Sequence, residues 1–275
     1  MTRKLVFGFV GVSALVAIAA VVVMFLPGAE AEVAAAQYSQ SIRGDCVTLS
    51  IEVDNEGSAP IYEPPSGTIP SFIKGQGSSP DRYYRYVELE KGNVYGINLT
   101  SCIAKQEVCI GLAIDGRCTL TGEQIPAKDI NQEETWPMGV VIDNDGYACN
   151  GWQTGYQGGK RFVVTQEAES FAVEYKDDPT ALGTIVVAVF RGTRPKSASP
   201  QTRGGKGIGT GVGEDFDNPL ADSNFQAMPY AYSLYYFRYA THKQLVEWGV
   251  KPKNSVAASG NRLFPGNNSF ISLNK

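Results

Sequence analysis

Histidine is nearly missing from this chain, in which His242 is the only one among 275 residues. A Ser-His-Asp or Cys-His arrangement needs a histidine as its base, so any such site would have to include that residue. His242 stands beside Lys243 at the start of a short expected helix, a place typical of an ordinary exposed histidine. We therefore predict no catalytic residue and no enzyme activity, and we expect no bound cofactor.

Runs of lysine and arginine are also missing, and the formal net charge is -4 at pH 7. Proteins that bind nucleic acids present a basic patch to the phosphates, so nucleic acid is not an expected partner. Zinc is improbable as well, because the sequence has no C-x-x-C spacing and a single histidine. With 43% hydrophobic and 19% charged residues, the composition is that of a globular protein.

Acidic residues gather after residue 213, and we predict no metal there, with Asp215 and Asp217 as weak calcium candidates. Their spacing does not follow the EF-hand loop, and solvated carboxylates are the alternative. The segment 143–146 (DNDG) begins like a calcium loop, but Trp152 stands where the bidentate Glu is expected. Since Asp-Gly suits a type I′ turn, we interpret this segment as the turn of a hairpin.

The N-terminus carries the most specific signal in the sequence. Arg3 and Lys4 precede Leu5–Leu26, an uncharged apolar run that is long enough to span a bilayer as a helix. The charge order favours an N-terminus inside and the rest of the chain outside. Residues 1–31 are thus predicted to be a signal anchor that contacts the membrane through residues 5–26, or a signal peptide cleaved near Ala31. The expected location is the cell envelope, anchored in the inner membrane with the body extracytoplasmic, or secreted after cleavage.

Gly8-Phe9 ahead of this run resembles the cleavage site of type IV pilin precursors, although Ser13 stands where that family has a glutamate. A minor pilus component is therefore an alternative for the whole chain. A virion-associated membrane protein is another, because it would share the N-terminal segment, the exported cysteines and the strand pattern.

All five cysteines lie in the part expected to be exported, where disulfides persist. Cys102 and Cys109 flank six residues that would let them face each other across a hairpin. Cys118 with Cys149 is the natural second pair. Cys46 is then the odd thiol, unpaired or bonded to another chain.

Short segments of alternating or apolar residues, separated by Gly, Asp and Asn, predict an all-β fold. We expect an antiparallel β-sandwich, of jelly-roll-like or Ig-like order, with the N-terminal helix and one short helix, Thr241–Trp248, closed by Gly249. The expected strands are Cys46–Val53, Tyr83–Glu90, Val94–Ile103, Val108–Ile114, Gly139–Ile142, Tyr147–Trp152, Arg161–Thr165, Ser170–Tyr175 and Thr184–Arg191. The predicted division is an exported sandwich over 32–191 with a Pro-rich loop at 58–82, a linker at 192–203 and a Gly/Tyr-rich extension at 204–275.

The extension supplies the interface candidates. Glycines recur at every second position, which predicts a strand with one bare face or a flexible tether, and tyrosines from 230–239 are candidates to cover that face or to meet a partner. The candidates are Gly205, Gly207, Gly209, Gly211, Gly213, Tyr230, Tyr232, Tyr235, Tyr236 and Tyr239.

Together these features predict a structural or binding protein of a bacterial envelope or surface assembly that acts by contacts with other protein subunits. The rival hypothesis is an exported carbohydrate-binding module or carboxylate-dependent hydrolase, for which a groove lined with Trp and Tyr would be the sign.

Overall fold

The computed structural model describes residues 38–44, 46–65, 81–102, 106–126, 130–170, 179–194, 214–218, 220 and 223–253. The chain divides into two units, Met1–Glu32 and Val33–Lys275. The first unit, with the predicted span Leu5–Leu26, lies outside the described residues, as do all five candidate glycines of 205–213. No helix within the described ranges is long and apolar enough to cross a membrane.

β-Strands are the main regular structure of the described residues in the second unit. The first large sheet has the order β1-β5-β6-β18-β14-β8-β10, with β9 paired to β8. Its central strand β14 is buried at every position, which explains its continuous apolar sequence TIVVAVF. The strands are β1 (Tyr38–Ser39), β5 (Ile61–Tyr62), β6 (Asp81–Glu88), β18 (Ser233–Ala240), β14 (Thr184–Phe190), β8 (Val108–Ile114), β10 (Val140–Ile142) and β9 (Arg117–Cys118).

The second sheet has the order β12-β13-β7-β3-β2, with β11, β16 and β4 paired to its members. In β3, buried and half-buried residues alternate along VTLSIEV, so that one face of the strand points to the interior. The strands are β2 (Ile42–Arg43), β3 (Val47–Val53), β4 (Gly57–Ser58), β7 (Val94–Ser101), β11 (Tyr147–Cys149), β12 (Gly151–Gln153), β13 (Gly158–Val163) and β16 (Asp215–Asp217); β15 (Gly192–Thr193) and β17 (Gln226–Ala227) pair separately.

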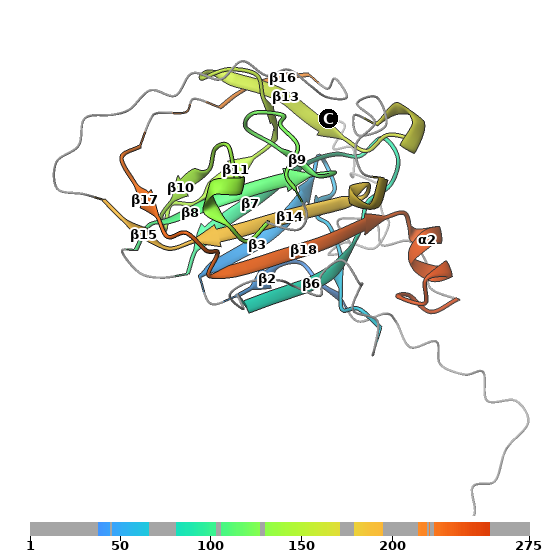
Figure 1. The fold of residues 1–275 in the computed structure, drawn as a ribbon. Coiled ribbons are helices and arrows are strands. Elements are labelled where there is room, and N and C mark those ends of the chain that lie inside the picture. Colours follow the sequence, from blue (N-terminus) through green and yellow to red (C-terminus); the bar gives the residue numbers. More distant parts are fainter. Residues whose placement is uncertain are drawn as a thin grey trace, which may run out of the picture. The chain divides into compact units, whose positions relative to one another are not determined.

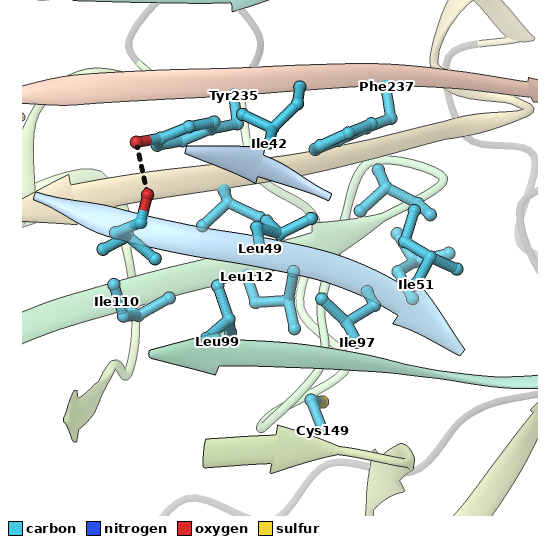
Figure 2. Close-up of a cluster of buried hydrophobic side chains, with 14 of the residues drawn as sticks. Ile42, Leu49, Ile51, Ile97, Leu99, Ile110, Leu112, Cys149, Tyr235 and Phe237 are labelled. Atoms are coloured by element: carbon cyan, nitrogen blue, oxygen red, sulfur yellow. Dashed lines mark hydrogen bonds between the residues drawn. The ribbon is translucent and has the colours of Figure 1, made fainter. Parts of the chain in front are cut away.

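The two large sheets share one hydrophobic core (Figure 2). Leu49 and Leu99 of the second sheet belong to the same buried cluster as Leu112 and Phe237 of the first. Across this core the Tyr235 hydroxyl donates to the Val47 carbonyl at 3.3 Å, the dashed bond in Figure 2. The sheets are therefore joined by apolar packing and by a buried polar contact.

The predicted short helix is confirmed as α2 (His242–Glu247), which follows β18 directly (Figure 1). Thr241 and Gln244 form a capping box at its start, and Gly249 has a φ of 72° just after its end. In the part of the chain that the structure describes, α2 is the one α-helix.

The prediction of an all-β fold with one short helix is confirmed, but the purely antiparallel arrangement is wrong. Strand β6 pairs with β18 in parallel, from Ser233 opposite Asp81 to Ala240 opposite Glu88. The predicted extension after the linker therefore contributes a strand to the middle of the first sheet, between β14 and β6 (Figure 1). Residues 195–203 of the linker lie outside the described residues, as does the predicted strand Ser170–Tyr175 from residue 171 onward.

Two predicted hairpins are also wrong, the one between Cys102 and Cys109 and the one at residues 143–146. In each case the strands on either side belong to different sheets, where we expected them to pair across a tight turn. Strand β10 pairs with β8 and β11 pairs with β7, so the segment 143–146 connects two sheets. The backbone amide of Asp145 donates a hydrogen bond to the Asp143 side chain at 2.9 Å. Asp145 does not have the positive φ that a type I′ turn requires. That geometry occurs at Asp115-Gly116, with φ values of 50° and 79°, where it closes the β8–β9 hairpin.

Gly111 of β8 packs under the ring of Trp136, and a Cβ there would lie 2.5 Å from Trp136 Cδ2. We expect Gly111→Ala to displace the ring and to lower the free energy of unfolding by about 1–3 kcal/mol, measured by urea denaturation. Gly155→Ala is the control, since nothing lies within 4 Å of a Cβ at that position. Equal stabilities of the two variants would contradict this account of the packing.

Candidate functional site

A cavity of about 280 Å³ is lined by residues at the end of β18 and the start of α2. Both sheets and the helix contribute to its wall. Its aromatic lining residues are Tyr95, Trp152, Phe162, Tyr239 and Trp248, and its charged ones are Lys91, Asp115, Glu167, Glu169 and Arg238. Aromatic and charged side chains therefore line the same hollow.

Strand pairing places the aromatic wall. Phe162 of β13 lies opposite Tyr95 of β7, and their rings stack with centroids 5.3 Å apart. Trp152 meets the Phe162 ring edge-on at 5.4 Å, and Tyr239 of the other sheet approaches Tyr95 at 6.3 Å. Offset and edge-on pairs of this kind hold rings in place, so the wall is ordered by the protein itself.

Asp115 provides the polar part of the cavity. Its carboxylate oxygens accept the Tyr239 hydroxyl at 2.9 and 3.0 Å, and Oδ1 also accepts the Gly183 amide at 2.8 Å. Burial raises the pKa of Asp115 from 3.8 to about 6, although these hydrogen bonds oppose the shift. Burial also raises the pKa of Tyr239, so its hydroxyl stays protonated and can donate to Asp115.

The rim of the cavity carries charges of both signs. Lys91 Nζ lies 4.0 Å from Glu169 Oε2, and Glu167 and Glu169 are exposed on the 3-10 turn Glu167–Glu169. The Arg238 guanidinium lies 5.8 Å from the centroid of Trp248, whose side chain is among the exposed large apolar ones. The opening therefore combines an aromatic face with hydrogen-bonding groups.

The raised pKa of Asp115 predicts a specific pH dependence of stability. Because the folded pKa of about 6 lies above the unfolded 3.8, the folded state binds more protons between those values. Stability from this group is full below pH 3.8 and falls by about 3 kcal/mol as pH rises through 6. We expect Asp115→Asn to remove this fall in denaturation measured from pH 4 to 7, whereas Asp217→Asn at an exposed site should keep it. An unchanged slope in Asp115→Asn would contradict the assignment.

The tyrosines predicted as interface candidates are placed mostly inside the fold. Tyr235 and Tyr236 are buried, Tyr232 and Tyr239 are partly buried, and Tyr230 is 47% exposed. Tyr235 stacks on Tyr83 of the neighbouring strand β6 at 4.7 Å. In the described structure these rings therefore serve the core and the cavity, and Tyr230 alone is left on the surface.

The calcium candidates lie on the edge strand β16. Asp215 pairs with Lys160 at 2.5 Å, and Asp217 is exposed. No group of three or more His, Cys, Asp or Glu residues in the described ranges is placed to hold a metal ion.

None of the five cysteines forms a disulfide in the structure. The predicted facing of Cys102 and Cys109 is wrong, because β7 and β8 belong to different sheets and form no hairpin. Cys118 and Cys149 are both buried; burial raises the pKa of Cys149 to about 11, and nearby Cys118 adds to the shift. The pairing of Cys118 with Cys149 stays a prediction.

His242 is not the ordinary surface residue that the sequence indicated. Its side chain is 21% exposed, and Nδ1 lies 3.3 Å from Oε1 of the buried Glu88. The same carboxylate accepts the Tyr62 hydroxyl at 2.7 Å and binds Lys251 Nζ at 2.5 Å. This cluster fastens α2 and the segment after it to β6.

Three comparisons, with protein-family models, curated proteins and solved structures, find no match to this chain.

Proposed function

We propose that the chain is an exported binding protein with a β-sandwich body held on the outer side of a membrane. The support for export is the basic Arg3-Lys4 pair followed by the apolar run Leu5–Leu26. The support for a sandwich is the single core that residues of both large sheets share.

The proposed binding site is the cavity lined by Tyr95, Trp152, Phe162, Tyr239 and Trp248 around Asp115. The observation that carries the proposal is this combination of an aromatic wall with a buried carboxyl group whose position is held by Tyr239 and Gly183. Small-molecule sites are typically concave and largely apolar, with a few polar groups that orient the ligand.

The ligand class we propose is a carbohydrate of about one sugar ring. The volume of about 280 Å³ lies near the lower end of small-molecule pockets, which start at about 300 Å³. A sugar presents an apolar face of C–H groups to an aromatic ring, and its hydroxyls exchange hydrogen bonds with carboxyl, amide and guanidinium groups. The cavity offers these groups as the Trp248 ring, the Asp115 carboxyl group and the Arg238 guanidinium.

We favour binding over hydrolysis of a glycoside. Hydrolysis needs two carboxyl groups flanking the scissile bond. Asp115 already accepts the Tyr239 hydroxyl on both oxygens, which suits a fixed binding group better than an acid that must exchange protons with substrate and water.

Assembly through the tyrosine-rich segment has less support than binding in the cavity. Met228 and Tyr230 are exposed by 57% and 47%, and two such side chains are too few to define a docking surface. Contacts with other subunits stay a prediction of the sequence.

The test is titration of the purified chain with a panel of monosaccharides, followed by calorimetry or ligand-observed NMR. We expect Trp248→Ala to weaken binding about tenfold, equivalent to about 1.4 kcal/mol, because it removes an exposed ring from the rim. Tyr230→Ala is the matched control, an exposed ring away from the cavity lining, and should bind as the wild type does. Absence of binding for every sugar, or equal loss in both variants, would refute the proposal; release of a hydrolysed product would favour the hydrolase instead.

A further inference from the structure

Cys46 and Cys102 lie opposite each other at one end of the β3–β7 ladder. Val47 pairs with Ser101 in antiparallel register, and one step further the Cys102 amide donates to the Cys46 carbonyl at 2.9 Å. Residues directly opposed in such a ladder have Cα atoms about 4.5–5.5 Å apart. A disulfide spans about 4.4–6.8 Å between Cα atoms, so the backbones stand at bridging distance.

Both sulfur atoms lie among polar groups at this end of the second sheet. Cys102 Sγ is 3.3 Å from Thr48 Oγ1 and 3.6 Å from the Gly44 carbonyl. Cys46 Sγ accepts from Arg191 Nη2 at 3.6 Å. The positive charge of Arg191 therefore lies beside the sulfur of Cys46, the thiol that would react second.

The two cysteines differ in exposure. Cys102 is partly exposed, whereas Cys46 is fully buried. An incoming disulfide can therefore reach Cys102 first, and Cys46 is placed to react with the product.

We propose that Cys46 and Cys102 form a reversible disulfide, with Cys102 as the attacking thiol and Cys46 as the resolving thiol. The oxidant is an exchange-active disulfide, either of a protein or of oxidised glutathione. This pairing replaces the Cys102–Cys109 bridge expected from the sequence and leaves no need for Cys46 to bond another chain.

The reaction balances as thiol–disulfide exchange. The Cys102 thiolate attacks one sulfur of the donor disulfide, which breaks the donor S–S bond and releases one donor thiolate. The Cys46 thiolate then attacks Cys102 Sγ in the mixed disulfide, which forms the internal S–S bond and releases the second donor thiolate. Two electrons pass to the donor, and the two protons from the cysteines end on the donor thiols or in the solvent.

The other three cysteines, Cys109, Cys118 and Cys149, provide a comparison for the reactivity of the proposed pair. Burial raises the pKa of Cys109 to about 12, and it raises those of Cys118 and Cys149 as well. Thiols that hold their protons react slowly in exchange, so these three should react after Cys102, the partly exposed thiol that attacks first.

The sequence makes the test direct, because trypsin places each cysteine on its own peptide. These peptides are 44–74, 92–105, 106–117, 118–128 and 129–160. The folded, reduced full-length chain is incubated in glutathione buffers of increasing oxidised fraction, free thiols are alkylated, and the digest is analysed by mass spectrometry. We expect a cross-linked 44–74/92–105 product, about 2 Da lighter than the two reduced peptides together, which disappears on reduction.

Matched variants separate this pair from the others. Cys109→Ser should leave the 44–74/92–105 product unchanged, and Cys102→Ser should abolish it while Cys46 becomes fully alkylated. The wild-type measurement stands on its own if Cys102→Ser does not fold. Linkage of peptide 92–105 to 106–117, or alkylation of both Cys46 and Cys102 in the most oxidising buffer, would overturn the proposal.

Discussion

Replacing Lys251 by methionine is expected to lower the free energy of unfolding by about 3–5 kcal/mol, the cost of breaking a buried ion pair on one side. Lys251 and Glu88 are 4% and 5% exposed, and their charged atoms are 2.5 Å apart. Without the ammonium group, the Glu88 carboxylate would stay buried beside Tyr62 and His242 with no cation as close as Lys251 had been. Chemical denaturation of the variant and the wild type measures the difference.

Two further variants make this prediction specific. Lys243→Met removes a lysine that is 85% exposed at its side chain, and it should change stability by no more than about 0.5 kcal/mol. The double variant Glu88→Gln, Lys251→Met should recover part of the loss, because no unpaired charge remains buried. A loss in Lys251→Met as small as in Lys243→Met would contradict the role of the cluster in fastening the segment after α2.

Phe237→Ala is expected to lower the free energy of unfolding by about 3–5 kcal/mol, the range for removing a buried aromatic ring. Phe237 is 1% exposed and belongs to the cluster that both large sheets share. The loss combines the burial of the ring with the cavity that its removal leaves. Thermal or denaturant unfolding, followed by circular dichroism, measures it.

This variant also tests the position of β18. If the segment after the linker were an extension lying on a sheet that is complete without it, Phe237→Ala would leave the unfolding transition of residues 32–191 unchanged. A strand between β14 and β6 instead predicts that the whole transition shifts. Tyr38→Ala, at a ring that is 48% exposed, is the control and should shift it little.

Individual strands were predictable because the pattern of apolar residues along a strand reflects which of its faces are buried. The alternation in β3 and the apolar run in β14 follow directly from one-sided and two-sided burial. The pairing of strands within a sheet was harder to predict, since a local sequence pattern does not show which strand lies beside which. The connections after Cys102 and after Ile142 resemble hairpin turns in sequence, because a short segment can either close a hairpin or lead from one sheet to the other. The parallel β6–β18 pair joins segments that are far apart in the sequence.

The candidate site was hardly predictable for the same reason. Asp115 directly follows the expected strand Val108–Ile114, but its partner Tyr239 is 124 residues away, and no local spacing links the two. Trp152 ends the expected strand Tyr147–Trp152, but its place in a cavity wall depends on β13 and β7. The environment of His242 was not predictable because Glu88, which it contacts, belongs to β6, far from α2 along the chain.

The most direct test of the proposed function is a crystal structure of the protein soaked with the sugar that binds best in the monosaccharide titration. The account predicts density for one sugar ring in the cavity, against the Trp248 ring and within hydrogen-bond reach of Asp115 or Arg238. Density for the sugar elsewhere on the protein, with this cavity holding only water, would contradict it.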